Sequence, residues 1–218
     1  MELKTIRKEN YRVLLELDKK VYPTDSPVTP RVLDQWYQRN PEFGMVYREK
    51  GKIVGLGIAI PLNAKAWKRL INGELAESDL NSETIFDNSK DKEIGIHVYH
   101  IEKLDKSIKE FHKTFLIDLS KIIGKLRIKN PNLEIIGFSG LCVTNEGIGL
   151  LSRKLTCKER EYKCNEYILE KDNKKIVFKA DSKKELDSKI ADGYKLINRC
   201  QMLVTYPGEK SIVWEFFK

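Results

Sequence analysis

Three successive stretches decide the fold: residues 93–101 read EIGIHVYHI, residues 107–126 read SIKEFHKTFLIDLSKIIGKL, and residues 133–143 read LEIIGFSGLCV. The first and third are short runs rich in apolar residues, which predicts two buried strands. The middle stretch repeats apolar residues at helical spacing, which predicts a long helix with one apolar face. A strand, a long helix and a strand form a crossover unit, so we expect the two strands to run parallel.

Strands and helices alternate on both sides of this unit. Upstream, the sequence predicts a strand over residues 3–7, helices over 10–21 and 29–40, a hairpin of 44–48 and 52–60, and a helix over 63–70. Downstream, it predicts a helix over residues 145–155, strands over 162–169 and 176–179, a helix from Ser182, and two strands flanking Pro207-Gly208. This order predicts an α/β fold with a mixed central sheet and helices on both faces. We expect residues 1–170 to form the main domain and residues 171–218 a small β-α-β-β extension packed on it.

The composition is that of a soluble globular protein, with 41% hydrophobic and 33% charged residues among 218. No apolar run approaches the ~18 residues that span a bilayer, and the charged N-terminal segment does not resemble a secretory signal. We therefore expect a cytoplasmic protein without a membrane partner. The four cysteines and three histidines lie at spacings typical of neither a zinc site nor a disulfide framework, so no metal is expected.

The formal net charge is +8, from 40 basic and 32 acidic residues. Because the excess is moderate and spread along the chain, nucleic acid is not an expected partner. A surplus of this kind can still attract a phosphorylated small molecule. Near the C-terminus, Trp214, Phe216 and Phe217 are expected to pack on the main domain, with a homodimer contact as the alternative.

The order of elements over about residues 1–170 resembles that of the GNAT (GCN5-related N-acetyltransferase) superfamily, whose members transfer an acetyl group from acetyl-CoA to an amine. In that family a turn of pattern Gln/Arg-x-x-Gly-x-Gly/Ala binds the pyrophosphate of CoA at the start of the long helix. An ungapped alignment puts residues 104–109, LDKSIK, on this pattern. Ser107 and Lys109 then replace the glycines, while Lys103, Lys106 and Lys109 bring positive charge to the helix start.

A second local match lies in the later helix. The family often shows Asn-x-x-Ala-x-x-Leu-Tyr-x-x-x-Gly-Phe, and residues 145–157 read NEGIGLLSRKLTC. Asn145 and Leu151 fit this pattern, and Asn145 is also a natural helix N-cap. Ser152 stands at the position of the tyrosine that protonates the departing CoA thiolate in many members.

The resemblance implies a set of site residues. The implied cofactor-binding residues are Tyr99, His100, Ile101, Lys103, Lys106, Ser107, Ile108, Lys109 and Asn145. The implied catalytic residues are Glu93 and His97 as general bases and Tyr99 and Ser152 as acids. The implied acceptor-binding residues are Tyr22, Asp25, Trp36 and Tyr37. Strand alternation supports the catalytic set, because it puts Glu93, His97 and Tyr99 on one face.

Two functions stay open at this point, beside a third, a nucleic-acid-associated protein, that rests only on the +8 charge. One is an acetyl-CoA-dependent N-acetyltransferase, in which an unidentified amine attacks directly with general-base assistance. The other is a catalytically inactive GNAT-fold module for binding or regulation, which the lost glycines and Ser152 favour. On the second interpretation His97 is a satisfied core histidine and Trp36 and Tyr37 are core aromatics. Cys142 is expected to be a structural thiol on either interpretation.

Overall fold

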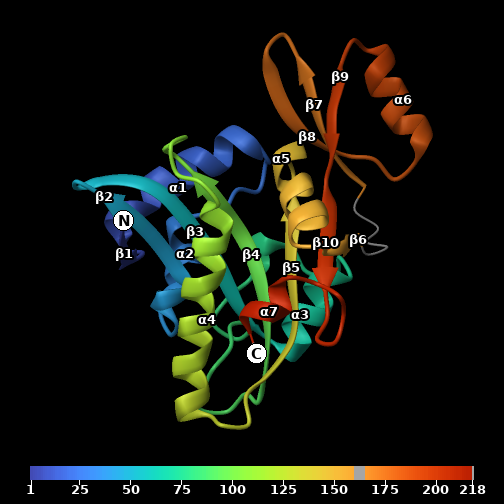
Figure 1. The fold of residues 1–218 in the computed structure, drawn as a ribbon. Coiled ribbons are helices and arrows are strands. Elements are labelled where there is room, and N and C mark those ends of the chain that lie inside the picture. Colours follow the sequence, from blue (N-terminus) through green and yellow to red (C-terminus); the bar gives the residue numbers. More distant parts are fainter. Residues whose placement is uncertain (160–164, 218) are drawn as a thin grey trace.

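The computed structural model describes residues 1–159 and 165–217, which fold into a large and a small sheet with helices around them (Figure 1). The strands are β1 (Glu2–Thr5), β2 (Gly44–Glu49), β3 (Lys52–Asn63), β4 (Glu93–Lys103), β5 (Glu134–Cys142), β6 (Lys158–Glu159), β7 (Glu166–Lys171), β8 (Lys174–Lys179), β9 (Lys195–Arg199) and β10 (Gln201–Thr205). The α-helices are α1 (Lys8–Val21), α2 (Pro30–Tyr37), α3 (Ala64–Ile71), α4 (Phe111–Lys129), α5 (Asn145–Ile148), α6 (Lys183–Ala191) and α7 (Val213–Phe216). Single turns of other helix types are η1 (Pro41–Phe43), η2 (Glu77–Asp79) and the π-helical η3 (Gly149–Lys154). None of the helices in these two ranges has the length and apolar character of a membrane span.

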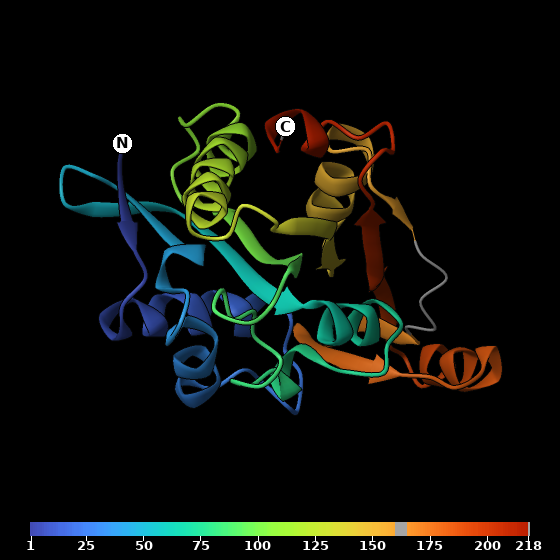
Figure 2. The ribbon, with the colours of Figure 1, turned by 90° about the horizontal axis from the view of Figure 1, so that it is seen from below.

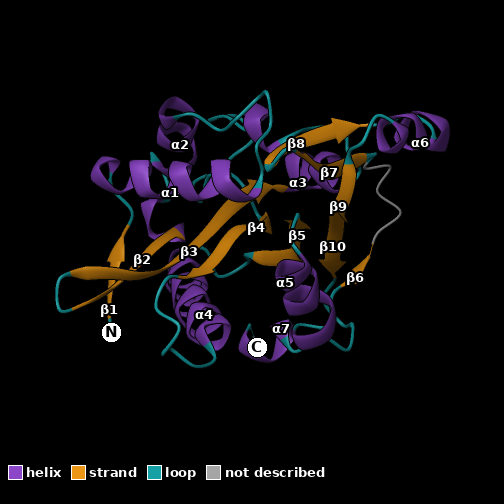
Figure 3. Cartoon of the chain, turned by 90° about the horizontal axis from the view of Figure 1, so that it is seen from above, coloured by secondary structure: helices purple, strands orange, loops and turns teal. Residues whose placement is uncertain are grey.

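The large sheet has the strand order β1-β2-β3-β4-β5-β10-β6. β4 and β5 run parallel, as the crossover through α4 predicts, and the other neighbouring strands pair antiparallel. Helices α1, α2 and α3 cover one face of this sheet, and α4, α5 and α7 cover the other (Figure 3). The predicted α/β fold with a mixed sheet and helices on both faces is therefore confirmed.

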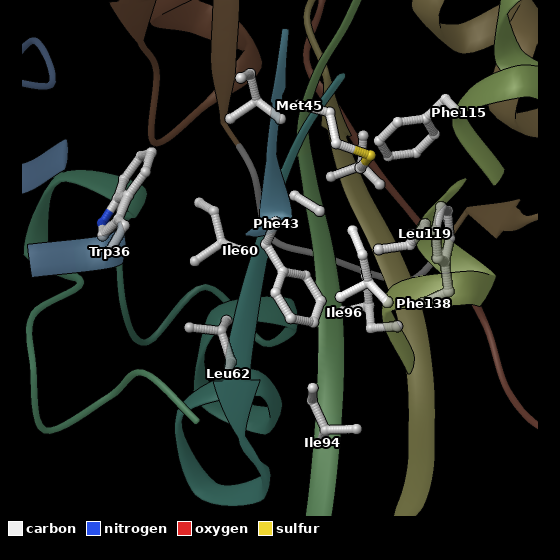
Figure 4. Close-up of a cluster of buried hydrophobic side chains, with 14 of the residues drawn as sticks. Trp36, Phe43, Met45, Ile60, Leu62, Ile94, Ile96, Phe115, Leu119 and Phe138 are labelled. Carbon is white, nitrogen blue, oxygen red and sulfur yellow. The ribbon is translucent and has the colours of Figure 1, made fainter. Parts of the chain in front are cut away.

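An apolar stripe on α4 packs against the sheet. Its buried residues are Phe111, Phe115, Leu116, Leu119, Ile122, Ile123 and Leu126. Figure 4 shows Phe115 and Leu119 gathered with Ile96 and Phe138 of the two parallel strands. Gly57 of β3 gives this helix its close approach, because a Cβ there would lie 2.3 Å from the ring of Phe115.

On the opposite face, α3 packs through Trp67, which is 1% exposed. Two glycines of the sheet provide the space that the Trp67 indole occupies. A Cβ at Gly95 of β4 would lie 2.1 Å from the indole, and a Cβ at Gly137 of β5 would lie 2.0 Å from it. Real Cβ atoms do not approach other atoms within 3.0 Å, so the close contact of α3 with β4 and β5 depends on both glycines.

The small sheet has the order β8-β7-β9 and lies in the sequence between β6 and β10. In Figure 2 these strands, in orange, lie beside α3 and on the side of α1. β10 follows β9 after one residue and enters the large sheet next to β5. The boundary that we predict at residue 170 falls inside β7, one residue before its end, and β7 pairs with β8. The division into residues 1–170 and 171–218 stays a prediction about domain organisation.

Helix α4 starts later than the sequence predicts. It begins at Phe111 rather than at residue 107. Asp105 explains the delay, because its carboxylate accepts the backbone N–H of Ser107 at 2.8 Å and holds the chain in a turn. The phosphate-turn alignment therefore does not coincide with the helix start.

The C-terminal third also differs from the sequence prediction in several places. The helix predicted over residues 145–155 is α-helical only to Ile148 and continues as the π-helical turn η3. Its N-cap is Thr144 rather than Asn145, since the Thr144 hydroxyl accepts the N–H of Gly147 at 3.0 Å. β7 begins at Glu166, and residues 162–164 of the predicted strand lie outside the described residues. The strand expected after Pro207-Gly208 is instead the short helix α7.

The C-terminal aromatic residues pack on the main sheet and α4. Phe217 is buried in the main core, and Trp214 and Phe216 pack against it. The Trp214 Nε1–H donates to Thr205 Oγ1 at 3.0 Å, and Arg127 Nη1 donates to the Phe217 carbonyl at 3.1 Å. The prediction that these aromatics cover the main domain is confirmed.

Candidate active site

β4 and β5 separate partway along their length. Their parallel register runs as far as Val98 and Gly140, after which β4 continues beside β3 and β5 beside β10. The register between β3 and β4 shifts at the same level and leaves Tyr99 without a partner on β3. Such a bulge redirects side chains, and it puts Tyr99 where the two parallel strands part.

A cavity of about 170 Å³, which we call the α5 cavity, opens where the strands part. Its lining is mostly apolar, with Glu102 and Glu146 as its two carboxylates. The other lining residues are Val21, Val98, Tyr99, His100, Ile101, Gly140, Leu141, Cys142, Val143, Thr144, Gly147, Leu150 and Leu151. These residues come chiefly from β4, β5 and the helix that follows β5. Burial, the nearby Cys157 and the charge of Glu77 raise the pKa of the Cys142 thiol to about 12. Cys142 is thus a neutral thiol in the cavity wall and not a nucleophile.

A second cavity of about 180 Å³, the α4 groove, continues from the first toward the start of α4. Its lining residues are Ile101, Lys103, Glu110, Phe111, His112, Leu150 and Lys154. Ile101 and Leu150 also line the α5 cavity, so the two spaces are adjacent. No side chain caps α4, and the first-turn N–H of Lys113 donates to the Glu110 carbonyl at 2.8 Å. Lys103 and Lys154 add positive charge, so the groove fits an anionic group.

A larger cavity of about 420 Å³, the α1 cavity, lies on the other side of the divergence. Its walls come from α1, the loop after α1, the segment after α3, and strands β7 and β8. It shares Tyr99 and Leu141 with the α5 cavity. Its charged lining consists of Asp18, Asp25, Glu77, Asp79, Glu166 and Lys179. Carboxylates predominate in this lining, so the cavity fits a positively charged ligand.

A chain of hydrogen bonds runs from α3 to the wall of the α1 cavity. The Trp67 Nε1–H donates to Ser139 Oγ at 2.9 Å, and Ser139 Oγ lies 3.0 Å from His97 Nδ1. His97 Nε2 lies 2.7 Å from Glu77 Oε1. The His97 side chain is fully buried, and the Glu77 side chain is 13% exposed at the cavity. The chain therefore connects the covered face of the sheet to a carboxylate that a ligand can reach.

A second polar group surrounds Tyr99. Its hydroxyl hydrogen-bonds to Asp18, and His100 Nε2 lies 3.3 Å from Asp18 Oδ1. Burial and the negative charges of Glu77 and Asp18 raise the pKa of Tyr99 well above its usual value. The indole of Trp36 packs edge-on against the Tyr99 ring, with 5.1 Å between ring centroids. Tyr99 is thus a neutral, firmly held O–H donor between two cavities.

The small sheet is linked to the main domain across the α1 cavity. The Tyr22 hydroxyl donates to Glu166 Oε2 at 2.5 Å, and Lys179 Nζ lies 3.3 Å from Glu166 Oε1. Burial, followed by the charge of Glu166 and this hydrogen bond, raises the pKa of Tyr22 far above its usual value. The loop after α1 and strand β7 are therefore joined by a charge-assisted hydrogen bond.

The structure brings together some of the residues that the sequence singles out. Tyr99, His100 and Ile101 line the α5 cavity, Lys103 lines the α4 groove, and Tyr22 and Asp25 line the α1 cavity. His97 is buried between Glu77 and Ser139.

Other predicted residues lie outside the lining of these three cavities. Lys106, Ser107 and Lys109 lie in the turn before α4, and Ile108 packs against the core. Trp36 and Tyr37 are buried in the core, where Tyr37 donates to the Ala59 carbonyl. Glu93 is exposed at the start of β4, Asn145 begins α5, and the Ser152 hydroxyl donates to the Ile148 carbonyl at 2.6 Å. Their functional roles stay predictions.

Sequence reasoning missed several residues that line the cavities or join the polar chain. Glu77, Asp79 and Glu166 carried no local signal, because each lies in a segment of unremarkable polarity. Ser139 did carry one. It is a lone hydroxyl in an apolar strand, and its expected position beside His97 follows from the parallel pairing.

The residues of the described ranges contain no group of three or more metal-ligating side chains that could hold a metal ion. No protein-family model matches the sequence, and no curated protein matches it. Several solved structures are similar to the chain over nearly its whole length, and two of them follow. Naa50 of Arabidopsis thaliana, in complex with the bisubstrate analogue CoA-Ac-MVNAL, has a TM-score of 0.50 at 8% identity, with 94% of this chain and 97% of that chain covered. NAA60 of Arabidopsis thaliana, in complex with acetyl-CoA, has a TM-score of 0.50 at 11% identity, with 95% and 99% covered.

These similarities and the diverging parallel strands define the class of the molecule. The chain has the GNAT fold, as the sequence resemblance indicated, in a divergent form. Between β6 and β10 the chain carries the small sheet and helix α6.

Proposed function

We propose that this protein transfers an acyl group from acetyl-CoA to the nitrogen of a positively charged amine. One observation carries the proposal: two cavities of opposite character lie on either side of the β4/β5 divergence and share Tyr99 and Leu141. Such an arrangement lets two different ligands meet at one point, as direct transfer between them requires. The similarity to Naa50 and NAA60, whose structures hold a CoA-based bisubstrate analogue and acetyl-CoA, supports this assignment.

The residues of the α5 cavity and the α4 groove fit acetyl-CoA. The apolar lining of the α5 cavity suits the pantetheine arm. Lys103, Lys154 and the N-terminal end of α4 suit the pyrophosphate. When bound, acetyl-CoA supplies a thioester carbonyl that a nitrogen nucleophile can attack.

The chain itself supplies polarisation and orientation. Where β4 and β5 part, strand N–H groups near Tyr99 are free of the β4/β5 ladder and can hydrogen-bond the developing oxyanion. The Tyr99 hydroxyl is kept protonated by its raised pKa and lies at the junction of the cavities, where it can hydrogen-bond the leaving sulfur once it gives up its bond to Asp18.

The acceptor follows from the charge of the α1 cavity. Its carboxylates, from Asp18 to Glu166, outnumber its single cation, Lys179. A cavity of this sign concentrates ammonium groups and orders them toward Tyr99. The volume of about 420 Å³ is that of a small-ligand site.

The test is a calorimetric titration of the purified protein with acetyl-CoA, with free CoA and ATP as comparisons. We expect micromolar binding of acetyl-CoA and of CoA, and no binding of ATP. Acetylation is then followed by thiol release with a panel of primary amines: 1,4-diaminobutane, benzylamine and glycinamide. The diamine should be the best substrate of the three because it carries a second cation. No binding at millimolar acetyl-CoA would overturn the proposal.

A second function is favoured by one observation at the α4 groove. Glu110 lines the groove, with a backbone φ of 50°, near the place where the family has glycine. A carboxylate there repels phosphate, although Lys113 pairs with it at 2.6 Å. If the titration shows no acetyl-CoA binding, the chain is a GNAT-fold module whose charged α1 cavity binds a cationic ligand without chemistry.

A further inference from the structure

The α1 cavity contains a carboxylate whose position depends on a buried histidine. We propose that Glu77 is the general base that deprotonates the acceptor ammonium, and that His97, Ser139 and Trp67 are positioning residues that hold it. This inference rests on the proposed function and adds the proton acceptor. Glu77 is 16 residues before Glu93 in the sequence, in the turn η2 that follows α3.

The chemistry of Trp67 and Glu77 fixes the direction of every hydrogen bond that links Trp67, Ser139, His97 and Glu77. An indole N–H can only donate, so Ser139 Oγ accepts from Trp67. An ionised carboxylate can only accept, so His97 Nε2 carries the proton that lies toward Glu77. A neutral imidazole has one N–H, so Nδ1 is an acceptor, and it receives the hydroxyl proton of Ser139.

A charged His97 would not fit this arrangement. Both ring nitrogens would then donate, and Ser139 Oγ would accept from His97 and Trp67 together. The Ser139 proton would have to find another acceptor in a fully buried position, which is costly. The neutral Nε2–H tautomer satisfies all four groups, so His97 acts as a fixed donor to Glu77 rather than as a base.

The base must therefore be Glu77, the group of this hydrogen-bonded series that is exposed in the α1 cavity. His97 has no exposed surface, so an amine in the α1 cavity cannot reach it. Glu77 Oε1 is engaged by His97, and the carboxylate is 13% exposed in the cavity lining that also contains Tyr99. Glu77 thus lies near the point where the two ligands meet.

The proton balance is simple. An acceptor ammonium holds three protons and cannot attack until one is removed. Glu77 takes that proton, and the carbon–nitrogen bond forms as the carbon–sulfur bond breaks. The second proton passes from nitrogen to the departing sulfur, and the third stays on the amide. Glu77 afterwards releases its proton to water in the open cavity.

Other charged groups around the same cavity also shape the pH dependence. Those that face Glu77 from the neighbouring elements are Asp18 on α1, Tyr22 and Asp25 in the following loop, Asp79 in η2, Tyr99 on β4, Glu166 on β7 and Lys179 on β8. A change at Glu77 must therefore be compared with a matched change of charge. Glu83→Gln provides this control, because Glu83 is an exposed carboxylate in the same segment and lies outside the three cavities.

The experiment measures acetyl transfer from acetyl-CoA to 1,4-diaminobutane between pH 6 and pH 10. We expect Glu77→Gln to lower kcat by roughly 100-fold or more at pH 7, within the range of a general base. The rate of the Glu77→Gln variant should rise about tenfold per pH unit, because the fraction of free amine in solution rises with the pH. Acetyl-CoA affinity should stay within about twofold of wild type, and Glu83→Gln should behave as wild type.

His97→Gln separates positioning from folding. Glutamine retains a donor toward Glu77, so kcat should fall by only about tenfold while the pH profile keeps its shape. His97→Ala removes the donor and should lower kcat further. In addition, ¹⁵N spectra of the wild-type His97 ring at pH 7.5 should show a protonated Nε2 and an unprotonated Nδ1.

Two results would overturn the inference alone. One is a Glu77→Gln variant with kcat within about twofold of wild type at pH 7. The other is a His97 ring that is protonated at Nδ1 at pH 7.5. By contrast, a wild-type protein that binds no acetyl-CoA, or acetylates none of the three amines, overturns the proposed function and this inference with it.

Discussion

The two cavities that meet at Tyr99 are built in different ways. Apart from Val21, the α5 cavity is lined by residues between 98 and 151, which belong to the crossover unit and the helix after it. The α1 cavity instead gathers its lining from segments between Asp18 and Met202. The α5 cavity is thus built from one part of the chain and is mostly apolar, while the α1 cavity is assembled from distant elements and is mostly charged or polar. On the proposed function, this contrast separates the acetyl-CoA side of the site from the acceptor side.

The largest expected effect is a loss of stability when Trp67 is removed from the sheet face that α3 covers. Trp67→Ala empties the space over Gly95 and Gly137 and leaves Ser139 without its indole donor. Such a change in a core aromatic costs about 3–5 kcal/mol of the free energy of unfolding. Urea denaturation followed by circular dichroism measures the loss. Trp214→Ala is the matched control, because Trp214 is only half-buried on the α4 face and should cost clearly less. Equal losses would contradict the importance that we assign to Trp67.

The second-largest expected effect is on acetyl-CoA binding at the α5 cavity. Leu150 lines both the α5 cavity and the α4 groove. Leu150→Trp fills the passage between them, and we expect acetyl-CoA affinity to fall by roughly 100-fold, about 2.7 kcal/mol. Calorimetric titration measures the change. Ile128→Trp, on an exposed position of α4, should bind as wild type does. Unchanged affinity in Leu150→Trp would place acetyl-CoA elsewhere.

The same contrast explains what the sequence could and could not predict. The parallel strands and the long helix were predictable because apolar spacing along one segment specifies them. The start of α4 was not, because the Asp105 turn delays it and the glycines that mark it in the family are absent. Tyr99 could be put on the correct face, but its bulge depends on the register with β3.

The charged side was least predictable. Tyr22 and Glu166 are 144 residues apart, and Glu77 and His97 are 20 residues apart, in segments without a shared pattern. Their meeting is a property of tertiary packing, which no local periodicity records. Asp25 could be predicted only because the resemblance indicated that the loop after the first helix faces the acceptor.

A smaller expected effect tests whether the small sheet contributes to the α1 cavity rather than to the α5 cavity. Tyr22→Phe removes the hydrogen bond to Glu166 but leaves Lys179 beside that carboxylate. We expect the free energy of unfolding to fall by about 1.5 kcal/mol, the usual size for a hydrogen bond to a charged group. The KM for 1,4-diaminobutane should rise several-fold, while acetyl-CoA affinity stays unchanged. If acetyl-CoA affinity falls instead, the link serves the α5 side and the contrast between the cavities is wrong.

The smallest effect reports from the α4 groove. Burial and the charge of Lys154 lower the pKa of His112, so between that pKa and the ordinary value near 6.5 the unfolded chain binds a proton that the folded chain does not. The lowered pKa of His112 therefore costs no stability above about pH 6.5. The free energy of unfolding falls as the pH drops through that window. A phosphate group bound beside Lys154 would counter its charge and raise the pKa of His112. Proton NMR titration of the His112 ring should thus give a midpoint below 6.5 that moves up in Lys154→Ala and also when acetyl-CoA is added. A midpoint that moves in the variant but not with acetyl-CoA would confirm the electrostatics of the groove and remove it from the binding site, since an anion held there cannot leave His112 unaffected.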